Sequence, residues 1–345
     1  MKAVRIHGPK KVSIDEVPVR EPGDYDAVIK VKAAGLCGTD YELYTNDMVY
    51  ITEGLAKLPL IPGHEWSGIV EKVGSKVSRF KQGDKVSGEC TVSCGKCEFC
   101  QQGRISQCID RTETGIMNRE GGFAEYIVFP ESHLHKFENI PFEEAALIEP
   151  TGIGLNAVIR GGVTPLDNLL VMGAGPVGLQ TAQIAKKIYG ARNVILIDIM
   201  DERLGRAASF GLDGTVNVSR EDLKRRVSDI TAGRMIDIVI EASGSTEAFR
   251  QTKEVIRPFG KMVLIGFFGS KKPEVDWDVF TTRDITIIGA LGSPGIWDNV
   301  IEMLDSGKIE TRSLISHKMS LKDFEKGLDL MVGRKDNAMK VILRP

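Results

Sequence analysis

The sequence has no long hydrophobic run, no block of like charges and no excess of either charge. No stretch approaches the roughly 18 apolar residues of a membrane-spanning helix, and residues 1–7 lack the apolar segment of a secretory signal. The 45 Lys and Arg residues against 47 Asp and Glu residues give a formal net charge of −2, which argues against strong binding to nucleic-acid phosphates. We therefore expect a cytoplasmic protein with neither a nucleic-acid nor a membrane partner.

Cysteine is scarce, and four of the six cysteines are clustered. Cys94, Cys97, Cys100 and Cys108 follow the pattern C-x2-C-x2-C-x7-C. In a reducing compartment, where disulfides are rare, four such thiolates can bind one Zn²⁺ tetrahedrally. Because no coordination position stays open, we expect a structural zinc that organises the polar segment 89–111. An iron–sulfur cluster is the alternative, because it also takes four thiolates. Cys90, outside the pattern, fits a small buried residue.

Residues 1–150 are rich in glycine and in short β-type runs. Turn pairs such as Pro22-Gly23 and Gly121-Gly122 separate the runs. Short strands with frequent turns predict an all-β, barrel-like domain. The strands expected here are 27–33, 66–73, 85–87 and 124–129.

From residue 151 onwards, strands alternate with helical patterns, which predicts a parallel sheet with helices on both faces. The expected strands are 168–172, 194–199, 216–218, 236–241, 261–267 and 285–290. The expected helices are 177–189, 202–210, 221–231 and 246–256. This domain is expected to span 151–292. The remaining part, 293–345, has helical patterns at 297–306 and 321–331 and a strand at 339–343 that can return to the first domain.

A glycine-rich turn follows the first strand of the α/β region. Gly173, Gly175 and Gly178 form G-x-G-x-x-G between the strand and a helix, which is the context of a dinucleotide-binding site. The glycines permit a tight turn and a close approach of the pyrophosphate, and the helix N-terminus attracts phosphate. Asp198 ends the second strand, where a carboxylate accepts hydrogen bonds from ribose hydroxyls and repels a 2′-phosphate. We therefore expect NAD rather than NADP.

Five more residues are expected to bind or border the cofactor. Pro176 and Val177 open the helix after the glycine turn, and Ser243 and Leu291 follow the strands 236–241 and 285–290. Arg203 lies five residues after Asp198 and is the one feature in this region that favours NADP.

Two other turns offer a thiol and an imidazole. Cys37 lies in the segment 35–40, G-L-C-G-T-D, and His64 in the segment 62–66, P-G-H-E-W. A thiolate with an imidazole suits Zn²⁺, and a catalytic zinc takes three protein ligands and leaves one position for water or substrate. The third ligand is Glu149, at the junction of the two expected domains, or Glu65, next to His64. The residues alone leave this choice open.

Together, these features resemble the zinc-containing medium-chain dehydrogenase superfamily over essentially the whole chain. The resemblance rests on the two turns above, the segments 83–86 (G-D-K-V) and 122–126 (G-F-A-E-Y), the four-cysteine lobe, the glycine turn and the C-terminal return. It implies an α/β plus β fold, in which a GroES-like β-barrel catalytic domain is interrupted by a Rossmann domain with a doubly wound parallel sheet. It places the site in the cleft between the two domains.

Site roles follow from the resemblance by position. Cys37 and His64 match catalytic-zinc ligands, Glu65 matches the acid after the histidine, and Thr39 matches the hydroxyl that relays the substrate proton. Glu149 matches a position that is Cys in the alcohol dehydrogenase branch and Glu in the polyol branch. This difference implies a polyol, cyclitol or sugar-acid substrate, with L-threonine 3-dehydrogenase as the second candidate.

The implied activity is the reversible oxidation of a secondary alcohol to a ketone with NAD and two zinc ions per chain. The segment 41–58 is expected to border the site with a polar set: Tyr44, Asn46, Asp47, Tyr50, Thr52 and Glu53. A zinc-free quinone reductase of the superfamily lacks Cys37, His64 and the cysteine lobe, and a non-catalytic NAD-binding protein could lose ligands; here none is lost. Superfamily members are commonly dimers or tetramers, so we expect a homodimer or homotetramer formed through the strand 285–290.

Overall fold

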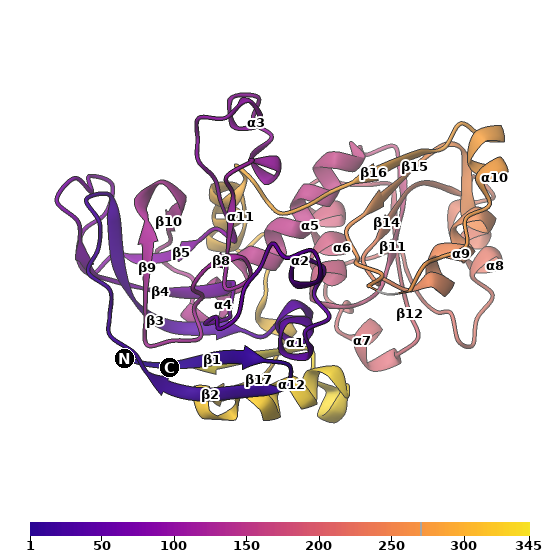
Figure 1. The fold of residues 1–345 in the computed structure, drawn as a ribbon. Coiled ribbons are helices and arrows are strands. Elements are labelled where there is room, and N and C mark those ends of the chain that lie inside the picture. The colour runs from indigo at the N-terminus through magenta and orange to yellow at the C-terminus, as the bar shows by residue number, and fades with distance from the viewer. Residues whose placement is uncertain (270) are drawn as a thin grey trace. The chain divides into compact units, whose positions relative to one another are not determined.

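The computed structural model describes residues 1–269 and 271–345, and the chain divides into two compact units. The first unit comprises Met1–Glu149 and Gly292–Pro345, and the second comprises Pro150–Leu291. In Figure 1, the C-terminal segments of the first unit lie beside its N-terminal strands. The first unit is therefore assembled from two separate stretches of chain.

A seven-stranded sheet forms the framework of the first unit. Its order is β10-β5-β4-β3-β18-β17, with β9 also paired to β3. The strands are β3 (Asp26–Gly35), β4 (Glu65–Val73), β5 (Lys85–Gly88), β9 (Tyr126–Pro130), β10 (Leu134–Lys136), β17 (Ile315–Ser320) and β18 (Lys340–Arg344). β18 pairs with β3 through Ile342 opposite Gly35 and Leu343 opposite Ala34, so the C-terminal strand lies in the large sheet of the first unit.

The core of the first unit forms where the apolar faces of these strands meet the aromatic side chains. Trp66, Phe123 and Phe129 are fully buried, and Trp66 packs edge-on against Phe129 with ring centroids 5.2 Å apart. A hairpin, β1 (Lys2–Gly8) and β2 (Lys11–Glu16), lies outside the large sheet. The small sheet joins β6 (Thr91–Val92), β7 (Thr112–Thr114) and β8 (Asn118–Arg119).

The helices of the first unit are short. They are α1 (Gly38–Thr45), α2 (Val49–Thr52), α3 (Glu98–Gln101), α4 (Phe142–Ala145), α11 (Trp297–Asp305) and α12 (Phe324–Val332). The 3-10 turns are η1 (Ile105–Gln107), η2 (Glu131–His133), η3 (Arg312–Leu314), η4 (Leu321–Asp323) and η5 (Lys335–Asn337). A longer helix, α5 (Ile148–Gly161), begins with the last two residues of the unit's first stretch and continues into the second unit.

The second unit is a six-stranded parallel sheet with the order β13-β12-β11-β14-β15-β16. The strands are β11 (Asn168–Met172), β12 (Asn193–Asp198), β13 (Gly214–Asn217), β14 (Ile236–Glu241), β15 (Ile256–Leu264) and β16 (Thr286–Gly289). The helices are α6 (Pro176–Lys187), α7 (Asp201–Gly205), α8 (Leu223–Thr231), α9 (Thr246–Val255) and α10 (Trp277–Thr282). Counted within the unit, the strand order is 3-2-1-4-5-6, which is the order of a dinucleotide-binding Rossmann sheet.

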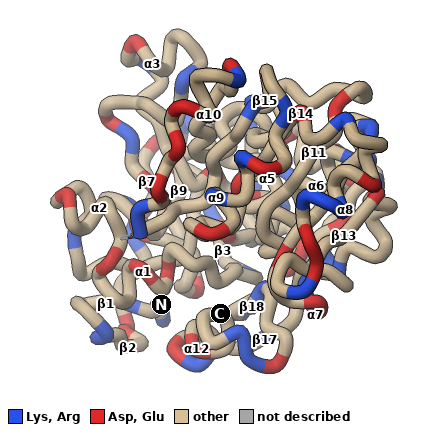
Figure 2. Tube along the Cα trace, turned by 90° about the vertical axis from the view of Figure 1, so that its right-hand side faces the viewer, with Lys and Arg blue, Asp and Glu red and all other residues tan. Residues whose placement is uncertain are grey.

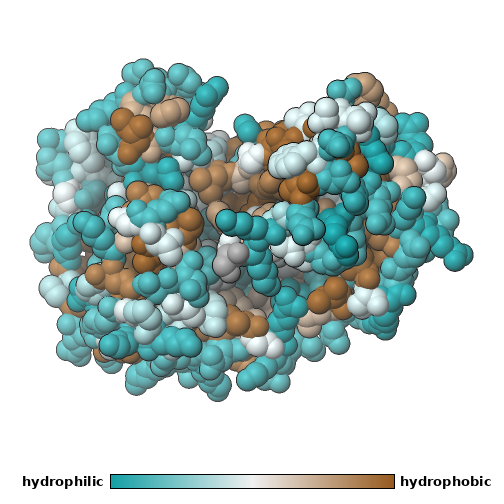
Figure 3. Space-filling view, turned by 45° about the vertical axis from the view of Figure 1, so that its right-hand side comes forward, coloured by the Kyte–Doolittle hydropathy of each residue, from teal (hydrophilic) through white to brown (hydrophobic). Residues whose placement is uncertain are grey.

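Burial explains the composition of this sheet. All five residues of β11 and all six of β14 are buried, as expected for parallel strands covered on both faces. In contrast, charged residues of both signs are interspersed along the chain trace (Figure 2), and the face drawn in Figure 3 is mostly hydrophilic with scattered hydrophobic groups. Among the described residues, no helix is long and apolar enough to cross a membrane.

Candidate active site

The pairing of β3 with β4 brings the first two candidate ligands together. Gly35 at the end of β3 lies opposite Glu65 at the start of β4. Cys37 follows β3 by two residues and His64 precedes β4 by one, so both side chains start from the same edge of the sheet. The ligand atoms of Cys37, His64 and Glu65 all lie within 4.8 Å of one another. The structure therefore assembles the thiol and imidazole that the sequence placed in separate turns.

Asp40 is a member of this cluster that sequence reasoning did not single out. Cys37 precedes α1 as its N-cap, and its backbone N–H donates to Asp40 Oδ2 at 2.8 Å in a capping box. The other oxygen, Oδ1, lies 3.9 Å from His64 Nδ1. Burial raises the pKa of Asp40 to about 6, although the charge of His64 lowers it. A carboxylate that hydrogen-bonds to a metal-binding imidazole fixes the orientation of the ring. The sequence feature that could have identified Asp40 is its position three residues after Cys37.

Glu65 is held by a lysine from the C-terminal strand. Lys340 Nζ donates to the two oxygens of Glu65 at 2.6 and 2.7 Å and to the backbone oxygen of Leu36 at 3.0 Å. Both side chains are buried. Burial is the largest single influence and lowers the pKa of Lys340, but Glu65, Cys37 and Glu149 together outweigh it and raise the pKa. The carboxylate of Glu65 therefore already has a cationic partner.

Glu149 lies at the start of α5 and is 6% exposed. Burial raises its pKa to about 7, against the effect of the nearby His64 charge. Among the residues that the structure describes, Glu149 forms no ion pair. It lies near His64 but outside the group of three ligand atoms that are mutually within 4.8 Å.

The cluster as a whole has an excess of negative groups. Cys37, Asp40 and Glu149 all raise the pKa of His64 well above its ordinary value, although burial alone lowers it. Lys340 is the cation that faces this set. His64 Nδ1 and Asp40 Oδ1 are buried and have no hydrogen-bond partner within the described chain. A thiolate, an imidazole and carboxylates in a negative, buried pocket fit a zinc ion.

Two polar groups border this cluster. Thr39, in the first turn of α1, places Oγ1 3.9 Å from Cys37 Sγ. Tyr50 donates from its hydroxyl to Glu113 Oε1 at 3.4 Å, and Arg111 Nε donates to the same oxygen at 3.1 Å. The charge of Glu113 contributes to the raised pKa of Glu149. The trio of Tyr50, Arg111 and Glu113 therefore lies near the candidate metal ligands.

Other polar residues of the predicted segment 41–58 contact other parts of the first unit or lie at its surface. Tyr44 donates to Glu325 Oε1 on α12 at 2.7 Å, and this bond raises the pKa of Tyr44 to about 12. Thr52 donates to the backbone of Val49, and Asn46 ends α1 in the left-handed conformation with φ of 67°. Asp47 and Glu53 are exposed. Tyr50 is thus the member of the predicted set that the structure brings near the cluster.

The four-cysteine lobe is a second cluster with the donor set of a metal site. The sulfurs of Cys94, Cys97, Cys100 and Cys108 lie within 4.8 Å of one another, around the short helix α3 (Figure 1). Backbone N–H groups of Cys100 and Ile109 stabilise the Cys97 thiolate and lower its pKa to about 6, and the amide of Cys94 donates to Cys108 Sγ at 3.3 Å. N–H donors around closely spaced sulfurs stabilise thiolates, which are the ligand form of cysteine.

In the second unit, the glycine turn has the geometry that phosphate binding requires. Gly173 has a φ of +100°, and a side chain there would meet Ser243 at 2.9 Å. A side chain on Gly178 would lie 1.9 Å from the backbone oxygen of Gly173, whereas the space beside Gly175 is open. Pro176 and Val177 form the first turn of α6, so the helix N-terminus points at this turn.

Asp198, at the end of β12, is fixed beside the glycine turn. Its Oδ2 accepts the backbone N–H of Ala174 at 2.8 Å, and its Oδ1 accepts those of Ile199 and Met200 at 2.8 and 3.0 Å. Oδ2, which accepts one hydrogen bond, keeps a second lone pair for a ribose hydroxyl. Ser243 donates to Glu241 at the end of β14, Arg203 lies on α7, and Leu291 follows β16.

Comparison with known proteins agrees with this geometry. Residues 23–139 match the alcohol dehydrogenase GroES-like domain, and residues 176–306 match the zinc-binding dehydrogenase domain. An L-threonine 3-dehydrogenase of Anaeromyxobacter sp. (strain K) is 36% identical over 331 residues, which cover 95% of this chain and 93% of the relative. The chain belongs to the zinc-containing medium-chain dehydrogenase superfamily. The predicted family and fold class are confirmed, as is the prediction of an oxidoreductase that uses zinc and a nicotinamide cofactor.

Two further relatives define the range of the similarity. A sorbitol dehydrogenase of Bacillus subtilis (strain 168) is 31% identical over 348 residues, covering 100% of this chain and 97% of the relative. The solved structure of an alcohol dehydrogenase from E. coli CFT073, complexed with NADH, has a TM-score of 0.91 at 30% identity and covers 100% of this chain and 99% of its own. The superfamily thus joins zinc-dependent alcohol and polyol dehydrogenases, whose members differ in substrate.

Proposed function

We propose that this protein is an NAD-dependent zinc dehydrogenase that reversibly oxidises a secondary alcohol of a polyol, cyclitol or sugar acid to a ketone. The observation that carries the proposal is the cluster of Cys37, His64 and Glu65, whose ligand atoms lie within 4.8 Å of one another, with the buried carboxylate of Glu149 near His64. A non-catalytic NAD-binding protein has no need to bury an imidazole and an unpaired carboxylate beside a half-buried thiol, because burying such groups without a partner is costly.

The catalytic zinc is held by Cys37, His64 and Glu149. Glu65 is the alternative third ligand and lies closer to the other two, but both of its oxygens accept hydrogen bonds from Lys340. Glu149 is buried without such a cation, so a metal ion relieves its charge best. Glu65 then acts as a charge behind the ligands, held in place by Lys340. Cys94, Cys97, Cys100 and Cys108 hold the structural zinc.

The chain's own groups position the reactants and move the proton. Zinc, when bound, supplies a Lewis acid that makes a substrate hydroxyl more acidic, and NAD supplies the hydride acceptor. Asp40 places a carboxylate oxygen 3.9 Å from His64 Nδ1, where its charge favours the protonated ring but no hydrogen bond forms. Thr39 Oγ1, beside Cys37 Sγ, accepts the proton of the substrate hydroxyl and passes its own proton outwards.

The trio of Tyr50, Arg111 and Glu113 binds the polar groups of the substrate that do not react. Its donors and acceptors suit several neighbouring hydroxyls, which favours a polyhydroxylated substrate. L-threonine is the second candidate: a guanidinium can pair with a carboxylate, a buried carboxylate such as Glu113 can pair with an ammonium group, and the relative at 36% identity is a threonine dehydrogenase.

The test is the formation of NADH by the zinc-loaded protein with a panel of sorbitol, erythritol, inositol, an aldonate and L-threonine. We expect turnover with one or more polyhydroxylated members and loss of turnover in Cys37→Ala. Turnover with threonine alone would replace the first candidate by the second. Absence of turnover with every member, at a metal content of about two zinc ions per chain, would favour the non-catalytic alternative.

Self-association through β16 completes the proposal. β16 is an edge strand of the six-stranded sheet, and Ile287 on it is 37% exposed. An edge strand presents unpaired backbone groups to a second copy, so we propose a homodimer or homotetramer joined there. Light scattering on the wild type and on Ile287→Lys tests this proposal. A lysine buried in the interface should disrupt it, so we expect the variant to be a monomer.

A further inference from the structure

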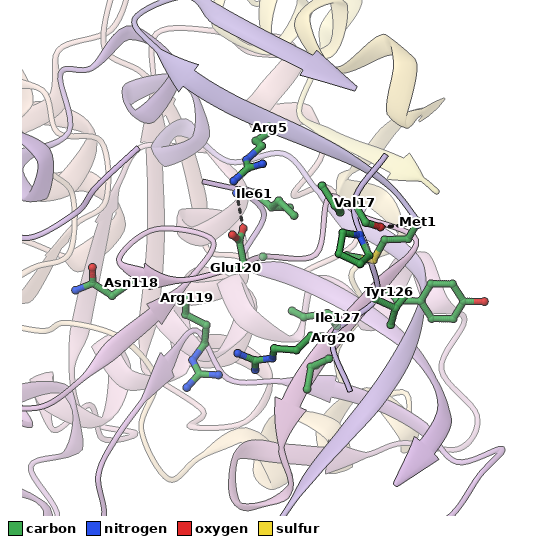
Figure 4. Close-up of a pocket in the computed structure, with 14 residues that line it drawn as sticks. Met1, Arg5, Val17, Arg20, Ile61, Asn118, Arg119, Glu120, Tyr126 and Ile127 are labelled. Carbon is green, nitrogen blue, oxygen red and sulfur yellow. Dashed lines mark hydrogen bonds between the residues drawn. The ribbon is translucent and has the colours of Figure 1, made fainter. Parts of the chain in front are cut away.

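A cavity in the first unit is lined by none of the candidate zinc ligands and by no residue of the glycine turn. It has a volume of about 440 Å³, which is within the range of small-molecule sites. One wall is apolar and includes Val17, Ile61 and Ile127 (Figure 4). Behind Ile61 and Val17, a small cluster of Ala3 and Ala124 closes the floor.

Three arginines from separate segments line the same cavity: Arg5 on β1, Arg20 after β2 and Arg119 on β8 (Figure 4). Arg119 is fixed, since its Nε donates to Thr112 at 2.9 Å and its guanidinium lies over the ring of Phe129. Burial lowers the pKa of Arg119, and the charge of Arg20 lowers it further. The partly desolvated guanidinium of Arg119 and the exposed one of Arg20 thus line the same cavity (Figure 4).

The acidic groups near the cavity offset only part of this charge. Glu120 Oε2 accepts the backbone N–H of Ile61 at 2.6 Å. Asp15 lies 4.0 Å from Arg5, and Asp26 acts on Arg119. Within residues 1–269 and 271–345, Arg20 forms no ion pair, and Arg5 Nε is buried without a hydrogen-bond partner. The cavity therefore combines an apolar wall with three guanidinium groups, of which that of Arg20 has no ion-pair partner among the described residues.

We propose that this cavity binds a small molecule with a carboxylate or phosphate at one end and an apolar portion at the other. Arg20 and Arg119 bind the anionic group, because guanidinium pairs with both oxyanions in a bidentate manner. The apolar portion packs on Val17, Ile61 and Ile127. None of the lining residues belongs to the proposed alcohol site or to the glycine turn, so the proposal does not depend on the identity of the substrate.

The test is isothermal titration of the zinc-loaded protein with hexyl phosphate and with hexanoate, in the presence of saturating NADH so that the glycine turn is occupied. Hexanamide, which is uncharged, is the ligand control. We expect saturable binding at one site per chain, weakened about tenfold or more in Arg20→Gln, which is the loss of one charge-assisted bond. The better of the two probes identifies the head group.

Arg119→Gln should weaken binding similarly, but it also removes contacts to Thr112 and Phe129. Arg20 is exposed and makes no such contacts, so Arg20→Gln tests the site even where Arg119→Gln fails to fold. Arg192→Gln, an exposed arginine of the second unit, is the matched control and should bind as the wild type does. Equal affinity in Arg20→Gln and the wild type, equal binding of hexanamide, or no saturable binding of either anion would overturn the proposal.

Discussion

Lys340 Nζ lies 2.6 and 2.7 Å from the two carboxylate oxygens of Glu65, although the residues are 275 positions apart in the chain. Their side chains are 3% and 1% exposed. The pair joins the first residue of β18 to the first residue of β4 and therefore ties the C-terminal stretch of the first unit to the strand that follows His64. Lys340 also neutralises one of the several negative charges in the cluster.

Lys340→Met should destabilise the protein strongly, because it leaves Glu65 buried without a cation. Loss of one partner of a buried pair costs about 3–5 kcal/mol. Urea unfolding of the zinc-loaded protein measures the change. Lys318→Met is the control, since Lys318 lies in the neighbouring strand at 3.8 Å from Glu143 and is half-exposed; such a pair contributes at most about 1 kcal/mol. Equal losses of unfolding free energy in the two variants would show that the Lys340–Glu65 pair contributes no more stability than the Lys318–Glu143 pair.

Asp198→Ala should shift the cofactor preference from NAD towards NADP. The change removes the acceptor for the ribose hydroxyls and the charge that repels a 2′-phosphate. Loss of a hydrogen bond to a charged group, about 1.5–3 kcal/mol, corresponds to a fall of about ten- to a hundredfold in the NAD to NADP ratio of kcat/KM. Glu202→Gln, on the neighbouring helix and exposed, should leave the ratio unchanged. An unaltered ratio in Asp198→Ala would place the determinant elsewhere, with Arg203 as the next residue to change.

Much of the second unit could be predicted because its strands are continuous apolar runs that end in glycine or acid. The predicted strands 168–172 and 236–241 match β11 and β14 at both ends. β15 differs: 261–267 was predicted, and the strand spans Ile256–Leu264. The strand begins earlier and continues through Phe259, which has a φ of 61°, and its pairing with β14 shifts register. Alternation of apolar residues does not reveal such an irregularity. Similarly, the predicted helix 202–210 ends at Gly205.

In the site, the candidate ligands could be selected from the sequence, whereas the residues that contact them could not. Cys37 and His64 stand in short turns whose composition indicates metal binding. Lys340 is a charged residue in an otherwise apolar C-terminal strand, and its partner Glu65 is determined by a pairing of strands that lie far apart in the sequence. Arg111 and Glu113 lie next to the cysteine lobe in the sequence, yet they face Tyr50 and the other metal cluster.

Cys97→Ser should reduce the zinc content from about two ions to about one per chain, because the closed site needs all four thiolates. We expect the segment around α3 to become sensitive to limited proteolysis, since little apolar packing holds it: α3 has no buried residue. Cys90→Ser is the control and should keep both zinc ions. A visible charge-transfer absorbance and iron in the purified wild type would instead identify the lobe as an iron–sulfur site.

His135 should make stability depend on pH in the neutral range. Its Nε2 lies 2.8 Å from Glu89 and its Nδ1 2.7 Å from Asp298, and its ring stacks on Trp297. Burial lowers the pKa of His135, but the hydrogen bonds to Glu89 and Asp298 outweigh it and raise the pKa above 6.5. The stabilisation is therefore complete below the unfolded pKa of about 6.5 and is lost as the pH rises through the higher folded value.

The measurement is the difference in unfolding free energy between the wild type and His135→Gln, taken from about pH 6 to about pH 8.5 around the ordinary histidine pKa. Because Asp298 is largely exposed, we expect the wild-type advantage to be only about 1 kcal/mol larger at the acidic end. His317→Gln is the control, since the ring of His317 bonds to the Ser316 hydroxyl and forms no ion pair within the described chain. A difference that stays constant, or that grows with pH, would mean that the charged form of His135 does not stabilise the contact between β10 and α11.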